Sequence, residues 1–156
     1  MEKVLWAPWR IGYILQQKVT GCLFCHVVRK KKDRKNLVLE RKKHCFVMLN
    51  KYPYNNGHIM IIPYVHRADL DRIEDKVLLE MMQAAREYGI RMKKRMRAEG
   101  FNIGINIGKI AGAGIAGHLH LHVVPRWSGD SNFMPVLGKT KVISESFESV
   151  YDKLSR

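Results

Sequence analysis

The chain has 156 residues, 46% of them hydrophobic, and carries 28 Lys and Arg against 14 Asp and Glu, a formal net charge of +14 at pH 7. This length suits one globular domain over residues 1–156 and does not call for a second. No apolar run approaches the roughly 20 residues of a spanning helix, and no secretory signal is recognisable, so we expect a cytoplasmic protein without a membrane partner. The basic excess favours an anionic partner, such as phosphates or nucleic acid.

The first third of the chain is predicted to contain an aromatic segment followed by short strands. Residues 1–21 hold Trp6 and Trp9 and are too aromatic for a disordered tail. The polar, basic stretch 29–36 has no periodicity and is predicted to be an exposed loop. Asn56-Gly57 favours a tight turn between two β-prone runs, which therefore form a hairpin. The predicted strands in this part cover 37–40, 45–49 and 58–63.

The rest of the core, which we take as 22–127, alternates between one helix and two strands. Apolar residues recur at steps of three and four from Asp69 to Glu99, which predicts a long amphipathic helix. Period-two patterns predict strands at 101–108 and 118–125, and the extension 128–156 ends in a short amphipathic helix. The expected fold class is α+β: a small antiparallel sheet of about five strands with one long helix and a short C-terminal helix.

Two of the three cysteines lie in Cys22-Leu-Phe-Cys25. In a cytoplasmic chain this spacing indicates a metal knuckle or a redox pair before a structural disulfide. A closed zinc site needs two further ligands from elsewhere in the chain.

Three histidines stand at alternate positions of the last predicted core strand, where side chains at every second residue share one face. His118, His120 and His122 therefore line one surface, about 6 to 7 Å apart. Burying three imidazoles needs three sets of partners and adds nothing to packing that Val would not supply, so the face is predicted to be chemical. Metal ligation and catalysis both fit, and the spacing favours catalysis with at most one histidine bound to a metal.

The run His118-Leu-His120-Leu-His122-Val-Val resembles the signature of the histidine triad family of nucleotide hydrolases and transferases. The segments "NKYPYNNGHIMIIP" and "NIGKIAGAGIAGH" are similar to the hairpin and the phosphate loop of that family. The flanks "LWAPWR" and "VPRWSGDSNFMPV" look most like the branch of diadenosine tetraphosphate phosphorylases and hydrolases. The resemblance extends over most of the chain.

The resemblance implies a division of roles among the histidines. His120 would be the nucleophile that forms a nucleotidyl-histidine, His122 would hydrogen-bond near the scissile phosphate and the leaving group, and His58 would complete the cluster. The implied nucleotide-binding residues are His122 and Asn50, Asn106, Ala113, Gly114 and Ile115. The loop before the triad lacks the Gln and Ser or Thr of many relatives, so only its backbone contacts can be carried over.

Zinc-bearing relatives, and the similar galactose-1-phosphate uridylyltransferases, imply a structural zinc held by Cys22, Cys25, His66 and His118. His26, directly after the knuckle, is the rival ligand. No organic cofactor is implied. Relatives are typically homodimers whose sheets join, so a homodimer is expected.

The expected function is cleavage of a dinucleoside polyphosphate of the diadenosine tetraphosphate class. A nucleoside phosphoramidase would use the same residues and is the first alternative. An RNA- or polyanion-binding module that works through the basic clusters at 29–35, 41–43 and 93–97 is an alternative of another class.

Overall fold

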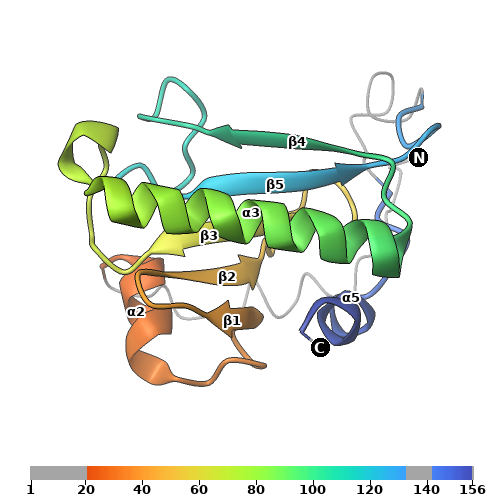
Figure 1. The fold of residues 1–156 in the computed structure, drawn as a ribbon, viewed down its shortest axis with the longest axis horizontal. Coiled ribbons are helices and arrows are strands. Elements are labelled where there is room, and N and C mark those ends of the chain that lie inside the picture. The colour runs from red at the N-terminus through yellow and green to blue at the C-terminus, as the bar shows by residue number, and fades with distance from the viewer. Residues whose placement is uncertain (1–20, 133–141, 156) are drawn as a thin grey trace, which may run out of the picture.

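A computed structural model describes residues 21–132 and 142–155, so the aromatic segment predicted at 1–21 lies almost wholly outside it. The α+β prediction is confirmed, with five strands, a long helix and a short C-terminal helix (Figure 1). In chain order the elements are α2 (Leu23–Lys30), β1 (Val38–Arg41), β2 (Cys45–Leu49), β3 (Ile59–Pro63), the 3-10 helix η1 (Leu70–Arg72), α3 (Asp75–Met96), β4 (Gly100–Ile105), β5 (Leu121–Arg126) and α5 (Phe147–Leu154).

The strands form one antiparallel sheet in the order β1-β2-β3-β5-β4. The predicted hairpin joins β2 to β3, and Gly57 in its loop has a φ of 72°. This left-handed backbone angle favours glycine, and a Cβ at Gly57 would lie 2.8 Å from Cε of Met96, at the flexible end of that side chain. Because β3 pairs with β5, the hairpin loop lies beside the strand that carries His122.

Helix α3 covers one face of the sheet, and in Figure 1 it lies in front of the strands and runs nearly along them. Its apolar stripe packs on Leu119, Leu121 and Val123, which alternate with the histidines. α5 packs against α3 at the far end of the sheet. The predicted alternation therefore separates the faces as expected: leucines and valine towards α3, histidines towards the opposite side.

The opposite face is partly covered by α2, a helix that the sequence analysis did not predict. Phe24 and Val27 are buried against the apolar side chains of β1, β2 and β3 on this face. Their spacing of three residues was the available signal, but the run is only eight residues long and overlaps the Cys22-x-x-Cys25 motif, which indicated a metal knuckle. The predicted loop at 29–36 is thus partly helical.

Several element boundaries were predicted wrongly, among them the end of the strand expected at 101–108, which stops at Ile105. The strand expected at 118–125 begins at Leu121, because Pro63 at the facing end of β3 has no N–H and its carbonyl accepts a bond from the side chain of His118 instead. The helix expected from Asp69 begins at Asp75, because Ile73 is extended, with φ −116° and ψ 128°, and buries its side chain in the core.

Among the helices of residues 21–132 and 142–155, none combines the length and the apolar composition needed to cross a membrane.

Candidate active site and metal centre

Four side chains that are distant in sequence meet at the N-terminal end of α2. Cys22, Cys25, His66 and His118 each direct one donor atom into a group whose members all lie within 4.8 Å of one another. The Nδ1 atom of His118 is 3.3 Å from Sγ of Cys22 and 3.2 Å from Nδ1 of His66. An ion with ligands at about 2.0–2.3 Å in a tetrahedron separates those ligands by roughly 3.3–3.8 Å. The cluster therefore has the spacing and the donor types of a metal site, and His26 is not part of it.

The hydrogen bond on the far side of His118 orients its ring for a metal. Its Nε2 lies 2.9 Å from the carbonyl oxygen of Pro63, and only an N–H can make that bond. The proton therefore sits on Nε2, and the lone pair of Nδ1 points into the cluster. Burial lowers the pKa of His118, which favours the neutral form that binds a metal.

His120 is held in the opposite tautomer, with its proton on Nδ1. Its Nδ1 lies 2.9 Å from the carbonyl oxygen of His118 and donates to it, so Nε2 carries the free lone pair. The ring is 4% exposed and packs against the buried ring of Phe24, with centroids 5.2 Å apart. Burial lowers the pKa of His120, so an unprotonated imidazole nitrogen is available at neutral pH. This is the state that a nucleophilic histidine requires.

A relay of hydrogen bonds connects the hairpin loop to His122. The backbone N–H of Tyr54 donates to Nδ1 of His58, at 3.0 Å. His58 then carries its proton on Nε2, which lies 2.9 Å from Nδ1 of His122 and donates to it. The remaining nitrogen of His122, Nε2, is therefore an N–H donor, and it is buried with no partner among the described residues. A buried unsatisfied donor of this kind is suited to an anionic oxygen of a ligand.

The backbone N–H groups of the loop before the triad differ in whether they are already hydrogen-bonded. The amide of Ala113 donates to the carbonyl of Gly108, at 3.2 Å, so it is already used within the loop. The amides of Gly114 and Ile115 have no partner within residues 21–132 and 142–155, and Gly114 lies in open space. Two of the three backbone N–H groups expected to bind phosphate are thus available, whereas that of Ala113 stabilises the conformation of the loop.

The two asparagines predicted to contact the nucleotide lie at different places around the histidines. Asn50 is buried beside His58, and its Oδ1 accepts the backbone N–H of Tyr52 at 2.9 Å. Asn106 is half-buried at the start of the loop, and its Nδ2 lies near Gly112, 4.0 Å from the position that a Cβ would take there. The geometry brings Asn50 to the histidine cluster and leaves its ribose contact a prediction.

The family model of the HIT domain matches residues 30–129 of the chain. The chain belongs to the HIT family. It is 38% identical over 150 residues to the AP-4-A phosphorylase of Mycobacterium tuberculosis, covering 90% of this chain and 76% of that protein. It is also 30% identical over 129 residues to the adenosine 5′-monophosphoramidase HNT1 of Saccharomyces cerevisiae, covering 81% and 77%.

Among solved structures, a Zn-bound histidine triad family protein from Mycobacterium smegmatis superposes with a TM-score of 0.72 at 26% identity, covering 86% of this chain and 91% of that chain. This HIT protein is thus an enzyme of the nucleotide hydrolase and transferase class, which confirms the resemblance drawn from the triad.

Three features of this HIT protein's site were not anticipated from the sequence: the packing of Phe24 against His120, the carbonyl of Pro63 behind His118, and Tyr54 beside the His58–His122 pair. Each includes a contact between segments distant in sequence, so residue types alone carry no signal for it. Trp127 donates from Nε1 to the carbonyl of Met96 and packs on the core.

Acid should destabilise this HIT protein through its buried histidines. Burial, with the neighbouring histidines, lowers the pKa of His58 to about 3 and that of His122 to about 4, both from 6.5. Below pH 6.5 the unfolded chain therefore binds protons that the folded chain does not bind. The contribution of these histidines to the free energy of unfolding is complete above pH 6.5 and is lost as the pH falls towards 4. Urea unfolding should give a free energy of unfolding lower by on the order of 2 kcal/mol at pH 5.5 than at pH 7.5.

A His58→Asn variant separates this effect from the pH dependence of metal binding, which both proteins share. We expect its free energy of unfolding to fall by about 1 kcal/mol less than that of the wild type over the same pH range, because the unfolded variant binds one proton fewer. Equal losses in the two proteins would contradict the assignment.

Proposed function

We propose that this HIT protein cleaves a dinucleoside polyphosphate of the diadenosine tetraphosphate class through a nucleotidyl-histidine intermediate on His120. The observation that carries the proposal is the bond from Nδ1 of His120 to the carbonyl of His118, which leaves a lone pair on Nε2 in a buried site. The similarity to the M. tuberculosis AP-4-A phosphorylase supports the choice of substrate class.

The proposed reaction has two displacements at one phosphorus atom. In the first, Nε2 of His120 attacks the α-phosphorus, a P–N bond forms, and the P–O bond to the remaining polyphosphate breaks. The Nε2–H of His122 is suited to hydrogen-bond the departing oxygen, and the amides of Gly114 and Ile115 are suited to the non-bridging oxygens. In the second, an oxygen of phosphate or water attacks the same phosphorus and the P–N bond breaks, which regenerates His120.

Zinc is the metal we propose for the Cys22, Cys25, His66 and His118 cluster. Two thiolates and two imidazoles are a usual structural zinc set, and a relative of 26% identity is Zn-bound. When bound, the ion would supply four bonds that tie α2 to the segment before β5. All four ligand positions come from the protein, so we assign the ion a structural role and no chemical step.

Product analysis tests the proposed activity. The purified chain is incubated with diadenosine tetraphosphate, with and without inorganic phosphate, and the nucleotides are separated by chromatography. We expect ADP and ATP with phosphate present, as in phosphorolysis. AMP with ATP in both samples would instead assign water as the acceptor.

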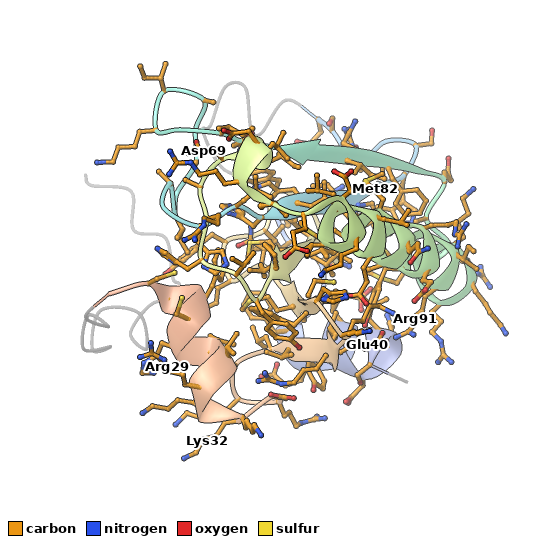
Figure 2. The ribbon with its side chains drawn as sticks, turned by 60° about the vertical axis from the view of Figure 1, so that its left-hand side comes forward. Arg29, Lys32, Glu40, Asp69, Met82 and Arg91 are labelled. Carbon is orange, nitrogen blue, oxygen red and sulfur yellow. The ribbon has the colours of Figure 1, made fainter. Side chains whose placement is uncertain are left out.

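The phosphoramidase alternative rests on the 30% identity to the S. cerevisiae monophosphoramidase. Cleavage of adenosine 5′-phosphoramidate with no cleavage of diadenosine tetraphosphate would favour it over our proposal. An RNA-binding module would use exposed basic side chains such as Arg29 and Lys32, which extend away from the end of α2 (Figure 2). Its binding to RNA would depend steeply on salt concentration, and that binding would persist when His120 is replaced.

We also propose that two copies of the chain pair through β4. This strand is an edge of the sheet and is largely exposed, with Ile103 48% exposed. α3 adds a stripe of exposed apolar side chains, Leu79, Met82 and Ile90. A free strand edge beside an apolar stripe suits a second copy related by a two-fold axis. Light scattering on the full chain should give the mass of a dimer, and a monomer at micromolar concentration would rule this pairing out.

A further inference from the structure

Tyr54 lies at the edge of the histidine cluster and is not accounted for by the proposed chemistry. Its ring stacks on His122, with centroids 5.6 Å apart and an interplanar angle of 28°, and lies 4.5 Å from the ring of His58. Even so, 53% of the residue is exposed. The stacking contacts limit the positions of the ring, while one side of it faces solvent at the site.

The hydroxyl of Tyr54 makes no hydrogen bond to any residue in the described part of the chain. The buried Nε2–H of His122, which has no partner among the described residues, belongs to the ring on which Tyr54 stacks. An exposed hydroxyl donor and a buried N–H donor on neighbouring rings match a ligand that offers several oxygen acceptors. A chain of phosphates does this, whereas an amine leaving group offers no such row of oxygens.

We propose that Tyr54 determines leaving-group specificity: its hydroxyl donates a hydrogen bond to the polyphosphate that departs from His120, beyond the oxygen held by His122. This inference rests on the proposed function and deepens it, because it assigns part of the site to the half of the substrate that leaves. No covalent step involves Tyr54. Its backbone N–H continues to fix the tautomer of His58 whatever side chain it carries.

The test is Tyr54→Phe, which removes the hydroxyl and keeps the ring that stacks on His122. Two substrates with the same adenylyl group are compared: diadenosine tetraphosphate, which loses a polyphosphate, and adenosine 5′-phosphoramidate, which loses ammonia. A hydrogen bond to a charged group contributes about 1.5–3 kcal/mol, which corresponds to a loss of roughly 10- to 100-fold. We expect kcat/KM to fall by about 10-fold or more for the first substrate and by less than about 2-fold for the second.

Tyr52→Phe is the matched control, since it removes the same group two residues away on the same loop, from a residue that is 61% exposed. It should leave both kcat/KM values within about 2-fold of the wild type. Equal losses on both substrates in Tyr54→Phe would assign Tyr54 to positioning of the histidines and overturn the proposal. No loss on either substrate would also overturn it.

Inorganic tripolyphosphate gives a second readout that does not need turnover of the dinucleotide. As a competitive inhibitor of phosphoramidate cleavage, it should bind Tyr54→Phe about 10-fold more weakly than the wild type. If the wild type does not cleave diadenosine tetraphosphate, the proposed function fails, and this inhibition constant still decides the role of Tyr54. An unchanged inhibition constant overturns the inference and leaves the proposed function intact.

Discussion

Replacing His120 with Asn should abolish turnover while leaving the fold and the metal site in place. The substitution removes the Nε2 lone pair that attacks the α-phosphorus in the proposed mechanism, and we expect kcat to fall by at least about 10⁴-fold. The Asn amide retains a donor for the carbonyl of His118, which the imidazole Nδ1 now contacts. Rates are measured on diadenosine tetraphosphate, and protein quenched during turnover is analysed by mass spectrometry for an adenylyl adduct.

The adduct distinguishes a nucleophile from a residue that only assists. The wild type should carry an acid-labile adenylyl group on His120 and the Asn variant should carry none. His122→Asn is the matched comparison because it removes the Nε2–H donor that the mechanism places next to the same phosphorus. Its rate should fall by about 10²- to 10³-fold, and its adduct should still form. Normal turnover in His120→Asn, or an adduct on another residue, would refute the mechanism.

Loss of the metal should destabilise the domain and release α2. The purified chain should contain one zinc ion per chain, and Cys22→Ser with Cys25→Ser should contain none. The cluster ties α2 to the segment that carries His118, and losing it should cost several kcal/mol, lowering the melting temperature by about 10 °C or more for a chain of this size. Activity should fall as well, since the carbonyl of His118 holds His120.

Cys45→Ala provides the control for a cysteine outside the cluster. Cys45 is fully buried in β2, and burial raises the pKa of its thiol to about 12, so it stays protonated. This variant should keep one zinc per chain, although its lost packing lowers stability by about 1–2 kcal/mol. An unchanged melting temperature on adding a strong chelator to the wild type would exclude a structural metal.

Local patterns in the sequence predicted most of the elements of the fold. Strand β2 begins and ends at the predicted residues, and the Asn56-Gly57 turn forms the predicted hairpin. These elements follow from alternation and turn chemistry, which act over a few residues. The start of α3 at Asp75 and the helix α2 were missed because each depends on a contact with the core: Ile73 in one case and Phe24 in the other.

By itself, the sequence predicted which residues carry the chemistry: three alternating histidines, a Cys22-x-x-Cys25 pair and a Gly-His hairpin are unusual enough to point to a site. Only the tertiary structure decided the state of each imidazole. Hydrogen bonds accepted by the carbonyls of Pro63 and His118, and the one donated by the amide of Tyr54, decide which nitrogen holds a proton. Those acceptors and donors are backbone atoms, which every residue possesses, so no pattern of side chains can predict them.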